Sequence, residues 1–174
     1  MHDIRPLIPL LITAGILIGG NGLQGTFIAL RGIEEGFSTS VIGMVGAGYF
    51  IGFVIGCVYI TKIMRAIGHI RAFSALAAIA SAASIMMVLV IDPISWFLMR
   101  LVQGVCFAGL FAVVESWLNA RVTNATRART LSVYRFVDLG SVTAAQYMIP
   151  LFGVSGIDLF AIIAMALSLS LVPI

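Results

Sequence analysis

The sequence predicts an all-α, polytopic membrane protein with six transmembrane helices. Hydrophobic residues make up 61% of the 174 residues and charged residues only 10%, whereas about a quarter of a soluble domain is charged. The mean hydropathy is +1.14. The apolar residues form long runs, and a run of about 20 is enough to cross a bilayer as a helix. Most of the surface must therefore face lipid.

Six apolar runs are separated by short polar or helix-breaking stretches such as RGIEEGFSTS and KIMRAIGHIR. The first run is too long for the core of a signal peptide, so we expect it to remain as an uncleaved span. The sixth run reaches Ile174 without a polar tail, so we expect the chain to be part of a longer protein. The predicted spans are 7–30, 40–61, 72–91, 94–118, 130–152 and 157–174.

Basic residues lie mostly on one predicted side of the membrane. The N-terminus and the second and fourth connections hold most of the 10 Lys and Arg residues: Arg5, Lys62, Arg65, Arg71, Arg121, Arg127 and Arg129. The other connections are mainly acidic, with Glu34, Glu35, Asp92 and Asp158 against Arg31. Basic loops stay in the cytoplasm, so both ends of the bundle are predicted to be cytoplasmic.

Polar side chains within the spans divide the helices into two groups. The third and sixth spans contain nothing more polar than serine. Polar groups are costly in lipid, so we expect spans one, two, four and five to surround a substrate or proton pathway. Its candidate residues are Asn21, Gln24, Tyr49, Arg100, Gln103, Glu115, Arg135, Asp138 and Gln146. Because the pattern repeats every three helices, we expect two inverted three-helix repeats.

The fifth span places Arg135 and Asp138 one turn apart, where the side chains are neighbours. At about 1.5 Å per residue, Glu115 and Arg135 lie at the same depth, so we expect all three to form a cluster. One interpretation is a clamp between the fourth and fifth helices. The alternatives are proton exchange at Asp138 or Glu115, and binding of a substrate ion by Arg135.

Arg100 permits two interpretations of its own. Its side chain either snorkels toward the outer edge of the membrane or points into a cavity near Asn21 and Gln24. The glycines of the second span also permit two interpretations. Gly48, Gly52 and Gly56 form a small-xxx-small ridge, which predicts close helix packing or a sliding contact with a second bundle.

The stretches GNGLQGTFIALR, VIGMVGAGYFIGFVIG, GHIRAF and RLVQGVCFAGLFAVVESWLNAR carry a family resemblance. From about residue 20 to 174, the chain resembles the N-terminal six-helix half of a major facilitator superfamily transporter, in particular the bacterial YcaD-like branch. The fourth-helix motif of that superfamily matches Arg100, Gln103, Gly104 and Gly109. The glycines of this motif are expected to serve helix packing.

The cytoplasmic loop motif of the superfamily is only partly kept. RAIGHIR retains Gly68 and Arg71, but Arg65 stands where the family has an acidic residue. The fifth-helix Gly-Pro motif of drug/proton antiporters does not occur in DLGSVTAAQYMIP. The resemblance therefore argues against that subclass.

The resemblance implies a secondary active transporter that moves a small solute by alternating access, with proton coupling, in the bacterial cytoplasmic (inner) membrane. It implies twelve helices, so the missing C-terminal six-helix half is an expected partner, beside the lipid bilayer. The alternative is a non-transporting six-helix module, a sensor or an assembly partner. No enzyme, cofactor or metal is expected, because the sequence contains neither an HExxH pattern nor a phosphate-binding glycine loop. The dispersed basic residues argue against nucleic acid.

Overall fold

A computed structural model describes residues 7–123 and 126–173, and these residues form helices and connecting turns without strands. Arg5 and Ile174, which the predictions above use, lie outside these ranges. The helices are α1 (Ile8–Glu34), α2 (Thr39–Ile67), α3 (His69–Leu89), α4 (Pro93–Ala120), α5 (Arg127–Gln146), α6 (Met148–Phe152) and α7 (Asp158–Leu169). The all-α prediction is confirmed for this part of the chain.

Helices α1 to α4 are each long and apolar enough to cross a membrane. Their boundaries follow local chemistry. Ser38 caps α2 by accepting a hydrogen bond from the Val41 N–H, and the Asp92 carboxylate accepts two from the first turn of α4, at 3.0 and 2.9 Å. Pro93 follows Asp92 at the first helical position, where its missing N–H has no cost.

The predicted fifth and sixth spans are less regular than the first four. Tyr147 interrupts the helix between α5 and α6. Pro150 explains the break, because it cannot donate to the carbonyl of Gln146, four residues earlier, and its ring would clash there. After the loop that contains Gly153, with φ +73°, α7 has 12 residues, where the sequence predicts the span 157–174.

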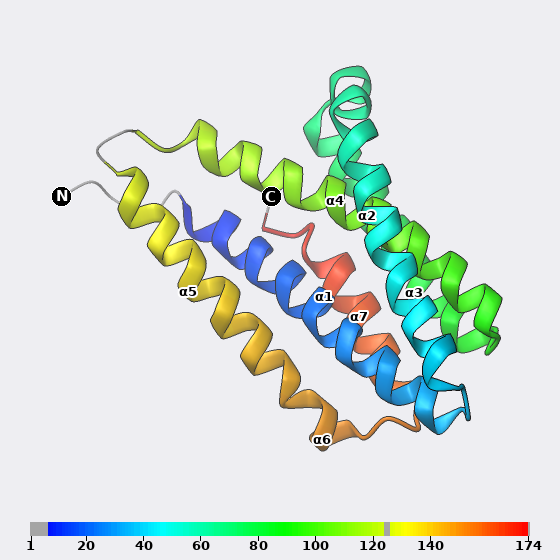
Figure 1. Cartoon of the computed structure of the whole chain (residues 1–174). Coiled ribbons are helices and arrows are strands. Elements are labelled where there is room, and N and C mark those ends of the chain that lie inside the picture. The colour runs from blue at the N-terminus through cyan, green and yellow to red at the C-terminus, as the bar shows by residue number, and fades with distance from the viewer. Residues whose placement is uncertain (1–6, 124–125, 174) are drawn as a thin grey trace.

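The helices pack in two groups around α1 and α4 (Figure 1). Helix α4 packs against α2 and α3, and α1 packs against α5 and α7. Helices α3 and α7 also contact each other. The main neighbour of α5 is therefore α1, although α4 precedes it in the chain.

The contact between α2 and α4 is made at backbone level. A β-carbon at Gly52 would overlap the carbonyl of Leu101, and a β-carbon at Gly104 would overlap the carbonyl of Tyr49. Gly48 and Gly56 lie against the Phe97 and Val105 carbonyls, at 2.9 and 2.8 Å from the position of a β-carbon. Of the two predicted alternatives for this ridge, the structure shows close packing within the chain.

Candidate functional site

A buried hydroxyl joins three helices in the middle of the bundle. The Ser84 hydroxyl on α3 accepts hydrogen bonds from Gln24 Nε2 on α1, at 3.0 Å, and from Gln103 Nε2 on α4, at 3.1 Å. It donates to the Ala80 carbonyl at 3.1 Å. All three polar side chains are fully buried. Three neighbouring helices are thus held together by hydrogen bonds to one oxygen atom.

Arg100 extends this set toward α2. One guanidinium nitrogen donates to Gln103 Oε1 at 3.2 Å, and the guanidinium carbon lies 4.5 Å from the ring centre of Tyr49. This is the geometry of a cation–π contact. Asn21 on α1 lies near the Tyr49 hydroxyl. We call these six residues the Arg100 network: Asn21, Gln24, Tyr49, Ser84, Arg100 and Gln103.

The position of Arg100 decides between the two interpretations of the sequence. Arg100 is only 6% exposed, so its side chain points into the bundle instead of snorkelling toward the membrane edge. Its Nε–H is buried and has no hydrogen-bond partner in the described part of the chain. No ion pair to Arg100 occurs among residues 7–123 and 126–173.

Ser84 is the member of the network that sequence analysis missed. The third span was expected to lie outside the polar region, because serine is its most polar residue type. Ser84 lies in an ASAAS stretch, and serine among alanines is also typical of close helix packing. The sequence carries no signal that would separate Ser84 from Ser81, which instead donates to the Ala164 carbonyl of α7 at 3.0 Å.

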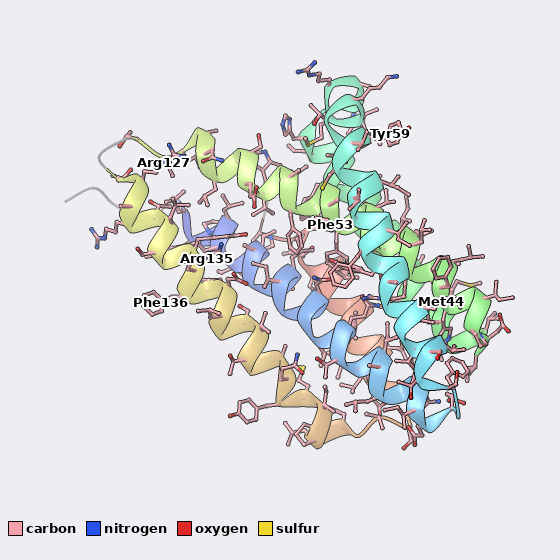
Figure 2. All side chains as sticks on the ribbon, viewed as in Figure 1. Met44, Phe53, Tyr59, Arg127, Arg135 and Phe136 are labelled. Atoms are coloured by element: carbon pink, nitrogen blue, oxygen red, sulfur yellow. The ribbon has the colours of Figure 1, made fainter. Side chains whose placement is uncertain are left out.

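A second charged group lies on α5. Arg135 and Asp138 form an ion pair of 2.8 Å, with their side chains 75% and 24% exposed. Figure 2 shows the side chain of Arg135 on α5. The expected ion pair between Glu115 and Arg135 is not formed, because α5 packs on α1 and Glu115 is exposed on α4.

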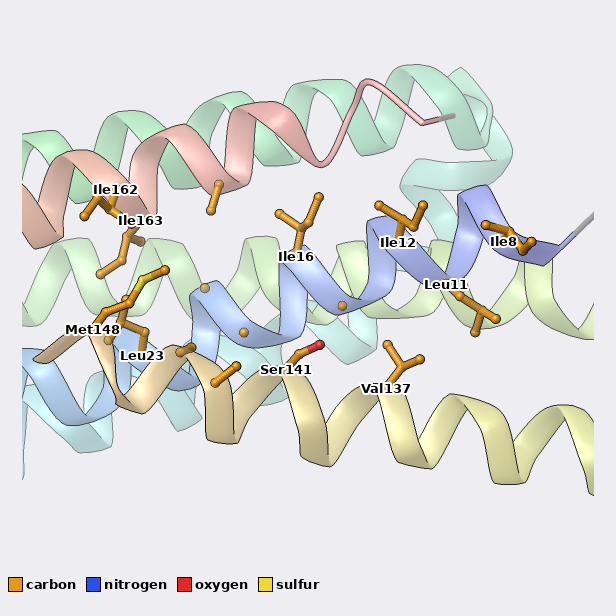
Figure 3. A pocket seen from close by; sticks show the side chains of 16 residues that line it. Ile8, Leu11, Ile12, Ile16, Leu23, Val137, Ser141, Met148, Ile162 and Ile163 are labelled. Carbon is orange, nitrogen blue, oxygen red and sulfur yellow. The ribbon is translucent and has the colours of Figure 1, made fainter. Parts of the chain in front are cut away.

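Gln146 connects α5 to α1. Its Nε2 donates to the Gly22 carbonyl at 3.1 Å, so it lies between the two helices and outside the Arg100 network. Beside this contact, an apolar groove of about 550 Å³ runs between α1, α5 and α7 (Figure 3). Ser141 supplies the only polar side chain among the residues that line it.

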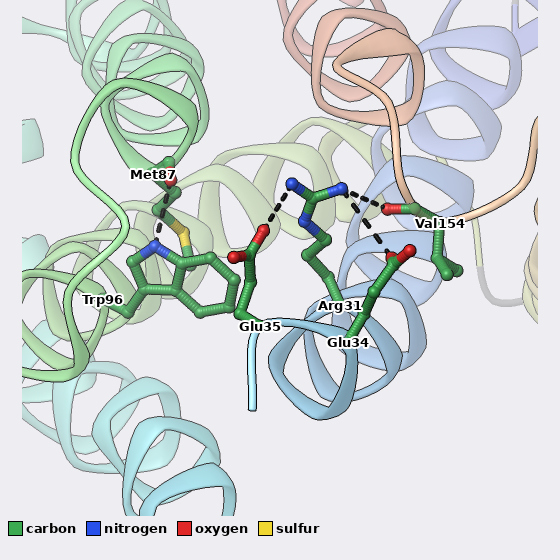
Figure 4. Close-up of polar contacts among 6 residues, drawn as sticks. All are labelled: Arg31, Glu34, Glu35, Met87, Trp96 and Val154. Atoms are coloured by element: carbon green, nitrogen blue, oxygen red, sulfur yellow. Dashed lines mark hydrogen bonds and ion pairs between the residues drawn. The ribbon is translucent and has the colours of Figure 1, made fainter. Parts of the chain in front are cut away.

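Arg31 connects the C-terminal end of α1 to the loop before α7. It pairs with Glu35 at 2.5 Å and Glu34 at 3.8 Å, and donates to the Val154 carbonyl at 2.8 Å (Figure 4). Close by, the indole N–H of Trp96 donates to the Met87 carbonyl at 2.9 Å. The end of α1 is thereby attached to the loop that precedes α7.

The cytoplasmic loop motif falls at the junction of α2 and α3. Gly68 is the single residue between these helices and has φ +83°, which glycine adopts without strain. Arg65 and Arg71 are exposed on either side of it. Gly109, the last glycine of the fourth-helix motif, instead lies deep in the bundle beside Leu76 of α3 and Ile60 of α2.

Long apolar helices around a buried polar network define the chain as a multi-pass membrane protein. No known family model matches it, and no solved structure does. It is similar to an uncharacterized MFS-type transporter of Enterobacter sp. (strain 638), with 29% identity over 145 residues. It is also similar to the uncharacterized MFS-type transporter YcaD of Escherichia coli O139:H28, with 31% identity over 133 residues.

These alignments cover 83% and 76% of this chain but only 38% and 35% of the two relatives. The chain is thus a homologue of the YcaD-like transporters of the major facilitator superfamily, as its motifs predict. It spans well under half the length of the relatives that it matches.

Proposed function

We propose that the chain is the N-terminal six-helix half of a secondary active transporter, which moves a small solute by alternating access and is coupled to protons. The Arg100 network carries this proposal. A largely buried set of amides, hydroxyls and a guanidinium is costly at the depth of a membrane. Polar residues at such depth are typical of substrate and ion pathways, and two relatives are described as transporters.

The pairing of the helices supports an arrangement of two inverted three-helix repeats. If α1, α2 and α3 correspond to α4, α5 and α6–α7, then the contact of α2 with α4 corresponds to that of α5 with α1. The contact of α3 with α4 corresponds in the same way to that of α7 with α1. An odd number of spans per repeat gives the two repeats opposite orientations in the membrane.

Two exposed apolar faces support a missing second half. Val54 and Val58 on α2 are 65% and 69% exposed, and Phe136 and Leu139 on α5 are 79% and 68% exposed. Both lipid and a second six-helix bundle accept such surfaces. We propose that the second half covers part of them, in a bacterial cytoplasmic membrane with the basic helix ends in the cytoplasm.

Transport is tested with the complete coding frame that contains this chain, expressed in bacteria. Inside-out membrane vesicles are energised, and the pH gradient is followed with acridine orange while pools of amino acids, sugars, nucleosides or organic acids are added. We expect one pool to dissipate the gradient, and Arg100→Gln to abolish the response. Right-side-out vesicles are tested in parallel, because only there does added solute drive protons inward with a symporter. If no pool changes the pH gradient in either kind of vesicle while the protein is intact in the membrane, a non-transporting membrane module is the better interpretation.

Asp138 is our candidate for proton exchange, because protonation would remove its ion pair with Arg135 within α5. A pair that is closed in one state of the transporter and broken in the other would couple proton binding to conformation. Asp138→Asn is expected to abolish pH-driven accumulation and to leave folding intact. Glu115→Gln is the matched comparison on α4. Retained accumulation in Asp138→Asn excludes the role for Asp138, and loss in Glu115→Gln alone transfers it to Glu115.

A further inference from the structure

Arg100 carries a permanent positive charge in a buried, largely apolar position. The described carboxylates are engaged or distant from it. Glu34 and Glu35 pair with Arg31, and Asp138 pairs with Arg135. Asp92 caps the start of α4, while Glu115 and Asp158 are exposed. A buried charge without a counter-charge is strongly destabilising, so the surroundings of Arg100 should contain a compensating group.

The protein itself compensates this charge only in part. The ring of Tyr49 and the carbonyl oxygen of Gln103 each contact the guanidinium, but both groups are neutral. The buried Nε–H has no hydrogen-bond partner among the described residues. Because Arg100 is only 6% exposed, a group that accepts a hydrogen bond from this N–H must lie inside the bundle. Such a group must be small.

A cavity of suitable size borders Arg100. Its volume is about 30 Å³, and it lies between the outer halves of α1, α2 and α4. Trp96 and Phe37 border it. Their rings are arranged edge to face, with the ring centres 5.1 Å apart. Since one water needs about 10–15 Å³, the cavity has room for one small anion but not for an extended solute.

We propose that this cavity binds one monovalent anion, no larger than chloride or formate, with Arg100 as its charge partner. The anion neutralises the guanidinium and accepts a hydrogen bond from Nε. Trp96 and Phe37 surround the remaining side. The proposal concerns binding only and does not depend on transport.

Trp96 provides a reporter for the test. The complete protein is labelled with 5-fluorotryptophan in lipid nanodiscs and studied by ¹⁹F NMR, and the Trp96 resonance is the one lost in Trp96→Phe. Sodium chloride, sodium formate and sodium benzoate are titrated against sodium gluconate at constant ionic strength. Trp117 is the internal control, because it lies 21 residues further along α4, about 31 Å away at the helical rise.

We expect a saturable shift of the Trp96 resonance with chloride and formate, and none with benzoate or gluconate. Formate acting without chloride would assign the site to a carboxylate ligand. Arg100→Gln should weaken binding at least about thirtyfold, as expected when one partner of a buried charge pair is removed. The same shift with every salt, or a shift that survives in Arg100→Gln, would overturn the proposal.

A second pair of variants tests the proposal independently, in case Arg100→Gln does not fold. Gly46 borders the cavity, whereas Gly43, one turn earlier on α2, does not. A β-carbon at either position has no neighbour within 4 Å. Gly46→Leu should fill the cavity and abolish the chloride response, while Gly43→Leu should keep it. Equal responses in both variants would place the anion elsewhere and contradict the proposal.

Discussion

The contacts of α2 with α4 and of α1 with α5 occupy corresponding places in the proposed repeats, but they differ in closeness. On the α2–α4 side, glycine lies against backbone, so that β-carbons at Gly52 and Gly104 would overlap carbonyl groups. On the α1–α5 side, Gly15 and Gly19 lie opposite Ser141. A β-carbon at Gly15 would lie 2.9 Å from the Ser141 hydroxyl oxygen, and one at Gly19 would lie 3.2 Å from the Ser141 carbonyl oxygen. The groove of about 550 Å³ opens beside this second contact.

The difference shows that small residues make contacts of two kinds in this chain. Where glycine meets a carbonyl group, no side-chain rotation can make room for a larger residue. Where it meets a serine or valine side chain, as Gly15 does, a change of rotamer can absorb part of the strain. Gly19 meets the Ser141 carbonyl, but at the longer distance of 3.2 Å, without overlap. We therefore expect α2 and α4 to move as one body, and α5 to be the more adjustable helix.

Gly52→Ala should have the largest effect. The added methyl group would overlap the Leu101 carbonyl, so the helices must separate, at a cost of about 3 kcal/mol or more. Thermal unfolding in detergent, followed by circular dichroism, measures the loss. Gly43→Ala on the same helix is the control and should be neutral or slightly stabilising. Equal melting temperatures for the two variants would contradict the close contact between α2 and α4.

Ser84→Ala should have the next largest effect. It removes the acceptor of Gln24 and Gln103 and leaves two buried amide groups unpaired, which costs about 2 kcal/mol or more. Ser81→Ala is the matched control on the same helix, because its hydroxyl is only half-buried, and should cost less than about 1 kcal/mol. A Ser84→Ala protein as stable as Ser81→Ala would show that the amides bond to each other without the hydroxyl.

Gly19→Ala tests the α1–α5 side directly. A β-carbon would lie 3.2 Å from the Ser141 carbonyl oxygen, a distance that a small shift of α5 can relieve. We expect a destabilisation of about 1 kcal/mol, well below that of Gly52→Ala in the same unfolding assay. A loss as large as that of Gly52→Ala would mean that α5 is held as rigidly as α2.

Removing the exposed ion pair should have the smallest effect. Arg135→Ala is expected to change the free energy of unfolding by less than about 1 kcal/mol, because exposed ion pairs contribute little. The change should shrink further at high salt. A larger, salt-independent loss would show that Arg135 has a buried partner in the complete protein.

The all-helical architecture could be predicted because it depends on local features. Apolar run length predicts a membrane helix, and capping residues such as Asp92 mark where helices begin. The contents of the buried network could be predicted in part, since Gln24, Arg100 and Gln103 are conspicuous in apolar runs. Ser84 could not, because its role depends on two amides that approach it from other helices.

The expected pair of Glu115 and Arg135 failed for a different reason. Helical rise gives the depth of a residue in the membrane, but not its lateral position. The helical rise predicts one depth for both residues, yet α5 packs on α1 instead of α4. The sequence also leaves undecided which helix packs on the glycine ridge, because a ridge in α2 does not reveal its partner.

The junction at Gly68 has a mechanical consequence. Helices of 29 and 21 residues meet through one non-helical residue, and a single residue supplies only two soft torsion angles. The connections 35–38 and 153–157 are longer and offer more degrees of freedom. A displacement of the segment that carries Arg65 and Arg71 should therefore move the adjoining ends of α2 and α3 together.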